Sequence, residues 1–501
     1  MSKPYYLTTA ISYPNGAPHI GHAYEAIAAD VMARFQRAQG RDVYFQTGTD
    51  EHGLKMAQAA RDQGMAPGEL AAKMSQLFID MCDALDVTYD RFIRTTDEDH
   101  HKACQAIWTA IEEKGDFYLG RYEGWYSVRD EAFYDEKELK EGEGGEKLSP
   151  EGTPVEWTVE ESWFFKLSAY QQPLLDHIAA NPDFIQPTSR RNEVVSFLES
   201  GLRDLSVSRT SFDWGVPLPG SEGHVMYVWL DALTNYITGV GYPDGGDKWD
   251  KYWPAACHLI GKDIVRFHCI YWPAFLMSAD IALPEQVYAH GHLLGEGGIK
   301  MSKSLGNVVD PKQMWERYGV DALRYFLMRE VTFGQDGAVG EEALVTRVNA
   351  ELANSFGNLA QRTLSMIHKN CDGVIPAAGN ASEDKALLDD VMAAATQKLP
   401  EAFDRWAFSA GLEAWLAAVY ACNAYVDTMA PWALKKTDPD RMAEVLGTLA
   451  AAIQPLALAL LPVAPTGAQA ILDQLKSGEG GQPIDKPTPA FPRLELPEQE
   501  A

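Results

Sequence analysis

The sequence predicts an α/β fold: a doubly wound, Rossmann-like parallel sheet with an inserted connective domain, followed by an α-helical bundle. Three observations predict it. Short apolar runs alternate with helical segments over residues 1–116 and again over residues 216–339, which is the rhythm of a parallel sheet. Residues 117–215 break this rhythm with a stretch rich in Trp, Tyr, Glu and Gly. Residues 340–501 carry long segments rich in Ala and Leu, with a C-terminal tail, as helical bundles do.

The first half of the sheet opens with a β-rich run over residues 5–11, which the turn residues Ser12-Tyr13-Pro14-Asn15-Gly16 end. Helical spacing follows from about residue 22 to 39. A second strand, residues 43–46, leads into Thr47-Gly48-Thr49-Asp50-Glu51-His52-Gly53. Ligands of doubly wound sheets bind beyond the carboxyl ends of the strands. We therefore expect a binding site where these two turns lie.

The second half resumes after the insertion, with strands expected at residues 225–230, 258–261 and 287–290. The run Gly261-Lys262-Asp263-Ile264 begins a crossover from strand to helix. In the bundle, helices are expected at residues 341–368, 383–407, 410–428 and 439–461. The tail after about Gly478 is expected to be an ordered strap or a frayed end.

Composition excludes several classes of protein. A formal net charge of −28 disfavours bulk attraction to nucleic acid but leaves room for a local basic track. Much of the acidity lies in residues 130–161, which hold twelve acids and three lysines, so RNA is expected to approach from elsewhere. We expect no signal peptide and no membrane span, because the apolar run 446–463 is interrupted by Gln454 and Pro455. The cytoplasm is the expected compartment.

Metal chemistry has little support in the sequence. None of the six cysteines forms a C-x-x-C pair, so neither a zinc knuckle nor a redox dithiol is expected. His290-Gly291-His292 has no third ligand nearby in sequence and is interpreted as a strand-end pair. The sequence therefore predicts no metal site.

Two short motifs carry the chemistry. In His19-Ile20-Gly21-His22, the histidines can donate hydrogen bonds to phosphate oxygens, and the glycine lets a nucleotide lie against the backbone. Lys300-Met301-Ser302-Lys303-Ser304 brings positive charge and hydroxyl donors. Together they supply what a triphosphate needs. The alternative is a satisfied histidine pair and a solvated lysine loop.

The order and separation of the two motifs resemble the nucleotide-binding apparatus of class I aminoacyl-tRNA synthetases. Further segments narrow the resemblance to the methionyl-tRNA synthetases, and they agree in order and spacing from Tyr5 to at least the region of Trp432. These segments are Ala10-Ile11-Ser12-Tyr13-Pro14-Asn15-Gly16, Gly48-Thr49-Asp50-Glu51-His52-Gly53, Tyr227-Val228-Trp229-Leu230-Asp231-Ala232 and Gly261-Lys262-Asp263-Ile264.

The resemblance implies a two-step reaction. L-Methionine and ATP, accompanied by Mg²⁺, give methionyl-adenylate and pyrophosphate. The methionyl group then moves to the 3′-terminal adenosine of tRNA(Met), elongator and initiator alike. By resemblance His19 and His22 act near the α-phosphate, and Lys300 and Lys303 hold the departing pyrophosphate. The ATP-binding set is completed by Gly21 and Ser302, in a loop expected to close over ATP.

The family's methionine pocket maps onto residues suited to a thioether and an ammonium group, since aromatic rings suit sulfur and a carboxylate suits the ammonium. Asp50 would face the amino group, while Tyr13 and His268 would meet the sulfur. Leu233 stands where some members have a proline. Each aromatic residue taken alone is also explained by core packing. The full set is Ala10, Ile11, Tyr13, Asp50, Trp229, Ala232, Leu233, Tyr236, Ile264 and His268.

The helical domain carries the RNA hypothesis. Asn358 and Arg362 stand four residues apart on one helix face, and Trp432 opens a further segment. Such side chains read single-stranded bases by stacking and hydrogen bonding, and by resemblance they read the CAU anticodon. Trp432 is alternatively a helix-packing residue, and Lys435 and Lys436 either touch phosphates or form a solvated pair.

Two departures from the wider family bear on zinc content and on oligomeric state. The insertion lacks zinc-binding cysteines, and no further oligonucleotide-binding domain follows, so we expect no structural zinc and a monomer.

Three rival functions remain. A synthetase for leucine, isoleucine or valine is disfavoured by the short insertion, and one for cysteine by the missing zinc ligands. A small-molecule adenylyltransferase would have little use for the helical domain. A catalytically silent RNA-binding protein would be expected to lose His19, His22 or Lys303.

Overall fold

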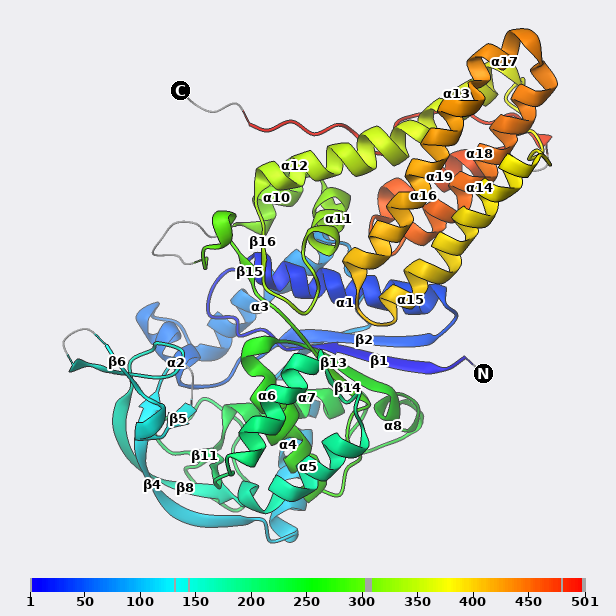
Figure 1. The fold of residues 1–501 in the computed structure, drawn as a ribbon. Coiled ribbons are helices and arrows are strands. Elements are labelled where there is room, and N and C mark those ends of the chain that lie inside the picture. Colours follow the sequence, from blue (N-terminus) through cyan, green and yellow to red (C-terminus); the bar gives the residue numbers. More distant parts are fainter. Residues whose placement is uncertain (1, 130–131, 143–144, 302–308, 479–480, 498–501) are drawn as a thin grey trace. The chain divides into compact units, whose positions relative to one another are not determined.

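The computed structural model describes residues 2–129, 132–142, 145–301, 309–478 and 481–497 of the 501-residue chain (Figure 1). The chain divides into two compact units. Unit 1 comprises Met1–Pro18, Gln39–Asp83 and Val87–His290, and unit 2 comprises His19–Ala38, Ala84–Asp86 and Gly291–Ala501. The helix that begins in the His19–His22 motif therefore belongs to the same unit as the C-terminal helices, although it lies close to the first strand in sequence.

A six-stranded sheet forms the centre of unit 1, and all its pairings are parallel. This confirms the predicted doubly wound parallel sheet. Its central strands are almost continuously buried, as expected where helices cover a parallel sheet. In order across the sheet, the strands are β3 (Arg91–Arg94), β2 (Asp42–Thr49), β1 (Pro4–Thr9), β13 (Ala256–Gly261), β14 (Gln286–His290) and β9 (Ile185–Gln186).

Helices from both halves of the predicted sheet pack together in unit 1. In particular α4, α7 and α9 contact one another and bury Trp108, Tyr236 and Trp272 in the main apolar core. The helices of this unit are α2 (Leu54–Asp62), α3 (Pro67–Ala84), α4 (Glu98–Glu113), α5 (Gln171–Ala180), α6 (Thr188–Glu199), α7 (Val228–Thr238), α8 (Asp247–Tyr252) and α9 (Trp272–Ser278).

The strand expected at residues 225–230 is wrong for most of its length. Only Val225–Met226 is extended, as β12, and it pairs antiparallel with β11 (Ser208–Arg209). Helix α7 begins at Val228. A short apolar run without polar alternation fits a buried helix as well as a buried strand, and α7 is buried along nearly its whole length.

The segment between the two halves forms its own antiparallel sheet, in the order β10-β8-β4-β5. Its long hairpin pairs β4 (Phe117–Ser127) with β8 (Glu156–Phe165), flanked by β10 (Leu205–Ser206) and β5 (Ala132–Tyr134). A small hairpin joins β6 (Lys140–Glu141) to β7 (Lys147–Leu148). The segment also supplies β9, the edge strand of the main sheet.

Unit 2 is largely helical, and the helices expected at 410–428 and 439–461 are found as α16 and α18. The helix expected at 341–368 is one helical run with a wider π turn at Asn349–Gly357. The helix expected at 383–407 ends at Phe403, before Trp406 adopts a positive φ of 60°. The helices are α1 (Ile20–Ala38), α10 (Pro311–Tyr318), α11 (Val320–Glu330), α12 (Glu341–Val348), α13 (Asn358–Asn370), α14 (Ser382–Ala393), α15 (Leu399–Phe403), α16 (Phe408–Met429), α17 (Pro431–Thr437), α18 (Pro439–Leu460) and α19 (Pro465–Lys476), with the strand pair β15 (Leu293–Leu294) and β16 (Gly337–Ala338).

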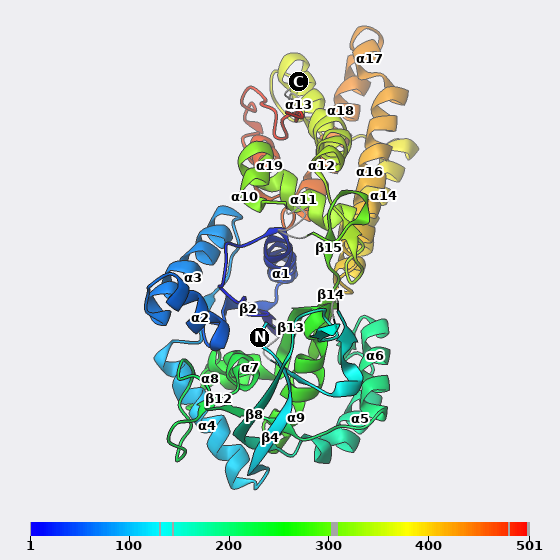
Figure 2. The same cartoon turned by 90° about the vertical axis from the view of Figure 1, so that its left-hand side faces the viewer.

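Helix α18 forms the middle of the bundle. It is long and apolar enough to cross a membrane, with a mean hydropathy of 1.6, but 61% of that window is buried inside the protein. It packs against α13, α14, α16 and α19 (Figure 1, Figure 2). This is the buried helix that the sequence predicts.

The C-terminal tail is a strap. Leu494 exchanges two hydrogen bonds of 2.8 Å with the side chain of Asn349, and the ring of Phe491 is buried against Gly357 and Gly467. Of the two expected forms of the tail, the ordered strap is the one observed up to Pro497.

Candidate active site

The two predicted turns of unit 1 lie side by side at the carboxyl edge of the sheet. Ser12 donates its amide to the carbonyl of Gly48 (2.9 Å), and Asp50 donates its amide to the carbonyl of Ser12 (2.9 Å). The neighbouring strand β3 requires glycine at position 48, because a Cβ there would lie 2.0 Å from the carbonyl oxygen of Ile93. The pairing places Asp50 beside the segment that carries Ala10, Ile11 and Tyr13, and buries it to 8% exposure.

Aromatic rings from α7 and from the crossover after β13 meet in the same unit. Trp229 stacks on Phe267 with ring centroids 3.7 Å apart and planes within 4°. The edge of His268 faces Trp229 at 6.2 Å, and the hydroxyl of Tyr236 lies 2.7 Å from Nε2 of His268. The structure thus brings three of the predicted pocket residues into one aromatic cluster.

The hydrogen bonds of His268 define its tautomer. Its Nδ1 lies 3.0 Å from the carbonyl of Ile264, which can only accept, so Nδ1 carries the hydrogen. In the neutral ring Nε2 then accepts from the Tyr236 hydroxyl. Burial lowers the pKa of His268 to about 4, against smaller raising effects of Ile264 and Asp263. The imidazole is therefore neutral at pH 7.

The remaining predicted pocket residues divide by burial. Ala10, Trp229 and Ile264 are half-buried and pack on the main core, whereas Leu233 is buried within it. Ala232 is buried as well. Tyr13 is half-buried, with its hydroxyl donating to the carbonyl of His52 at 2.8 Å, while Ile11, also half-buried, follows Ala10 in the same segment.

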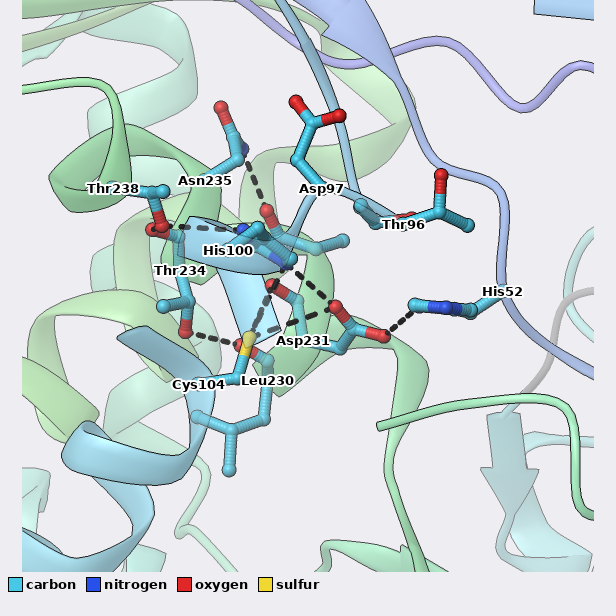
Figure 3. Close-up of polar contacts among 12 residues, drawn as sticks. His52, Thr96, Asp97, His100, Cys104, Leu230, Asp231, Thr234, Asn235 and Thr238 are labelled. Carbon is cyan, nitrogen blue, oxygen red and sulfur yellow. Dashed lines mark hydrogen bonds and ion pairs between the residues drawn. The ribbon is translucent and has the colours of Figure 1, made fainter. Parts of the chain in front are cut away.

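A buried polar cluster of Asp231, His52, His100 and Cys104 lies in the same unit (Figure 3). Asp231 on α7 has one carboxylate oxygen 2.7 Å from Nδ1 of His52 and the other 2.8 Å from Nε2 of His100. Cys104 lies 3.2 Å from the same nitrogen of His100. Burial by itself raises the pKa of Asp231, but the two histidines outweigh it and hold that pKa well below its usual range.

The H-I-G-H motif lies in unit 2, at the start of α1. The two histidine rings stack at 3.8 Å. Nδ1 of His22 accepts the amide of His19, and Nδ1 of His19 accepts the amide of Gly21, both at 3.1 Å. Each neutral ring therefore carries its hydrogen on Nε2. Burial, with His19 as a smaller cause, lowers the pKa of His22 to about 3.

Gly21 is needed for this arrangement. A Cβ at that position would lie 2.9 Å from Cε1 of His19.

In the second motif, residues 300–304, Lys300 is exposed and Met301 is half-buried. The predicted ATP-binding residues Ser302 and Lys303 lie outside the described residues, as does Ser304.

The three predicted RNA-binding residues of unit 2 lie on α13 and α17. Asn358 and Arg362 are exposed on α13, and the guanidinium of Arg362 lies 5.8 Å from the ring centre of Trp432. Trp432 is 48% exposed at the start of α17, where Ala430 turns the chain with a φ of 43°. The side chain of Trp432 is therefore accessible to a base, and the choice between base stacking and helix packing stays a prediction.

Sequence reasoning missed the residues that support the site. His52 and Asp231 lie within the motifs that carry the resemblance but have no predicted role, and neither His100 nor Phe267 is a predicted site residue. A signal was available for Asp231, because an acid inside the apolar run Val228-Trp229-Leu230-Asp231-Ala232-Leu233 requires a partner when buried. His100 precedes its partner by 131 residues and gave no such signal.

Comparison with known proteins agrees with this geometry. The family described as tRNA synthetases class I (M) matches residues 5–364, and the anticodon-binding domain of methionyl tRNA ligase matches residues 375–492. Curated methionine–tRNA ligases of Brucella suis and Rhizobium meliloti are 55% and 53% identical, each over 99% of both chains. A solved structure of Mycobacterium tuberculosis methionyl-tRNA synthetase in complex with methionyl-adenylate aligns with a TM-score of 0.94 and 50% identity, covering 98% of this chain and 100% of that one.

Proposed function

The chain belongs to the class I tRNA synthetases of the methionine type, and from that premise we propose that it is a methionine–tRNA ligase whose sequence-predicted residues perform the two steps. It activates L-methionine with ATP to methionyl-adenylate and then transfers the methionyl group to tRNA(Met). The observation that carries the proposal is the aromatic cluster of Trp229, Tyr236 and His268 in the same unit as the buried Asp50 loop.

In the activation step the methionine carboxylate is itself the nucleophile, so the protein needs no general base. Its contribution is to position the reactants and to stabilise negative charge on the phosphates. We assign charge stabilisation to His19 and His22. Because their Nδ1 atoms accept backbone amides, each neutral ring offers an Nε2–H donor, and the amides at the start of α1 add the positive end of a helix dipole.

Lys300 and Lys303 are proposed to hold the departing pyrophosphate, with Gly21 and Ser302 completing the ATP site. An exposed lysine suits this role, because a flexible ammonium can follow a leaving group, and Lys300 is exposed. Mg²⁺ is proposed to arrive with ATP. It neutralises phosphate charge when bound and needs one or two carboxylates at most.

The methionine pocket is proposed to combine a charged end and an apolar end. Asp50 receives the ammonium group, Tyr13 and His268 meet the sulfur, and Trp229 encloses the side chain with Ala10, Ile11, Ala232, Leu233 and Ile264. The thioether is a weak acceptor with a polarizable sulfur, which suits ring edges. Since both ring nitrogens of His268 already have partners, we assign to His268 the orientation of the Tyr236 hydroxyl in addition to contact with the sulfur.

Recognition of tRNA is proposed to centre on Asn358, Arg362 and Trp432. The exposed ring of Trp432 offers a stacking platform for a base. The exposed guanidinium of Arg362, which lies 5.8 Å from that ring, can donate to base edges or phosphates. Both elongator and initiator tRNA(Met) carry the anticodon that this set would read. The pair Lys435 and Lys436 is exposed on the same helix as Trp432.

Four further properties complete the proposal. The enzyme is a cytoplasmic monomer, it holds no structural zinc, and its catalytic domain occupies residues 1–116 and 216–339 around an insertion. The absence of cysteine from residues 117–215 supports the proposed lack of a structural zinc ion. Light scattering and metal analysis of the purified protein test the oligomeric state and the zinc content.

The experiment that tests the function is amino-acid-dependent ATP–pyrophosphate exchange without tRNA. Methionine is run beside leucine, isoleucine, valine and cysteine. Strong exchange with methionine alone is the expected result. Preference for another of these amino acids would keep the fold and overturn the substrate, whereas no exchange in folded protein would favour the adenylyltransferase or RNA-binding alternatives.

A further inference from the structure

Asp231 is an ionised carboxylate buried in the middle of the apolar helix α7. Its side chain is 0% exposed, and burying a charge is costly unless it is paired and hydrogen-bonded. Both oxygens are satisfied, one by His52 and one by His100, at 2.7 and 2.8 Å. A cluster that buries three ionisable groups so completely needs an explanation in terms of what it holds in place.

His52 links this cluster to the substrate loop. It stands two residues after Asp50, and its own carbonyl accepts the hydroxyl of Tyr13 at 2.8 Å. Fixing the His52 ring therefore fixes the backbone on which Tyr13 is anchored and from which Asp50 projects. The aromatic rings of Trp214 and His101 pack edge-on against the same ring, at 5.4 and 5.3 Å.

Asp231 also belongs to the helix that carries part of the proposed wall of the methionine pocket. Asp231 lies between Trp229 and Ala232 on the first turns of α7. Its carboxylate thus joins the loop that holds Asp50 to the helix that supplies the apolar wall. The loop is also held by β3. Arg94 on that strand donates to the carboxylate of Glu51 at 2.6 and 3.0 Å.

His100 holds the second carboxylate oxygen of Asp231 in place through its Nε2 atom. It lies on α4, with Nδ1 3.2 Å from the hydroxyl of Thr238, and the thiol of Cys104 on the next turn of the same helix lies 3.2 Å from Nε2 (Figure 3). His100, Cys104 and Asp231 have ligand atoms within 4.8 Å of one another, so a metal ion is an alternative occupant. A hydrogen bond joins the nitrogen and the oxygen that would have to face such an ion. This contact favours a hydrogen-bonded cluster over a metal site.

We propose that Asp231 is a positioning residue for methionine recognition: it fixes the distance between the ammonium-binding loop, through His52, and the aromatic wall of α7, with His100 as its support. The proposal rests on the proposed function. Its consequence is selective, since a loosened loop weakens methionine binding while the ATP-binding motifs, which lie in unit 2, keep their local structure.

The test is Asp231→Asn, assayed by ATP–pyrophosphate exchange with each substrate varied in turn. The amide keeps the size of the side chain, but its NH₂ group cannot accept from a histidine N–H. Loss of one hydrogen bond to a charged group is expected to raise KM for methionine roughly tenfold. KM for ATP and kcat are expected to change less than about twofold.

Cys104→Ala is the matched control, because it removes a side chain from the same cluster and leaves both histidine bonds to Asp231 in place. It is expected to lower Tm with KM for methionine unchanged. If Asp231→Asn does not fold, His52→Ala replaces it and His52→Asn, whose amide can donate near the position of Nδ1, is expected to restore methionine affinity.

Three kinetic results would overturn the proposal. They are an unchanged KM for methionine in Asp231→Asn or His52→Ala, equal rises in KM for both substrates, and the same methionine defect in Cys104→Ala. Stoichiometric zinc in the purified wild-type protein that is lost in Cys104→Ala would identify the cluster as a metal site instead. A wild-type enzyme without methionine exchange would refute the proposed function itself, which distinguishes the two failures.

Discussion

Arg324 donates to Asp30 at 2.6 Å, and both side chains are fully buried. The same guanidinium also donates to the carbonyls of Leu85, Pro462 and Val463, at 2.8 to 3.1 Å. One side chain thus ties α1, which begins at the H-I-G-H motif, to α11 and to the turn between α18 and α19. This explains why α1 forms a compact unit with the C-terminal helices.

Removing Arg324 is expected to destabilise unit 2. Arg324→Ala removes a fully buried cation from Asp30, which also pairs with Arg34, and breaking a buried ion pair from one side costs about 3–5 kcal/mol. The measurement is the midpoint of denaturant unfolding followed by circular dichroism. Arg34→Ala is the control, because Arg34 is 21% exposed, and it should cost less; an equal or smaller loss in Arg324→Ala contradicts this account.

Gly21→Ala is expected to impair activation without unfolding the protein. The new Cβ would lie 2.9 Å from the His19 ring, so the stacked histidine pair must move. We expect kcat of pyrophosphate exchange to fall by at least about tenfold, in line with the loss of a positioned donor, with Tm nearly unchanged. Gly120→Ala, in β4, whose Cβ would meet the ring of Phe164 at 3.1 Å, should leave exchange intact. Wild-type exchange in Gly21→Ala would remove the histidine pair from the mechanism.

Stability is expected to fall with acid because of His268. Burial lowers its pKa from 6.5 to about 4 in the folded protein, so the unfolded chain binds the proton more readily. The contribution of the neutral His268 ring to the free energy of unfolding is fully present above pH 6.5 and is lost as the pH falls towards 4. This effect is on the order of 3 kcal/mol. Unfolding free energies of the wild type and His268→Asn, measured between pH 4 and pH 7, check this; parallel curves would show that His268 titrates normally.

Trp432→Ala is expected to separate the two steps of the reaction. Stacking of a base on an aromatic ring contributes about 1–3 kcal/mol, so kcat/KM for tRNA charging should fall about tenfold or more while pyrophosphate exchange stays normal. Trp157→Ala, which removes an equally exposed tryptophan at 55%, is the control. Equal damage to exchange and charging would assign Trp432 a structural role.

Much of the fold follows from local patterns. The strands β1, β13 and β14 are short apolar runs that end in turn residues, and the long helices of the bundle carry continuous helical periodicity. The start of α7 was missed because a fully buried segment loses the alternation that distinguishes helix from strand. The end of α15 was missed because nothing in the local pattern signals the left-handed turn at Trp406.

The substrate residues were predicted from motifs, and their supports were not. Asp50 and Trp229 lie within runs that resemble a family, so a position in sequence sufficed to nominate them. Asp231 and His100 act through a contact across 131 residues, which periodicity and spacing do not encode. The roles assigned to the pocket and anticodon residues stay predictions until the variants are assayed.

The loop after β2 is proposed to bind the ammonium group of methionine through Asp50. The measurement we would make first is methionine-dependent pyrophosphate exchange by Asp50→Ala. We expect kcat/KM for methionine to fall by the equivalent of roughly 2–4 kcal/mol, because a buried charged contact is lost, with Tm close to that of the wild type. A value of kcat/KM equal to that of the wild type would contradict it.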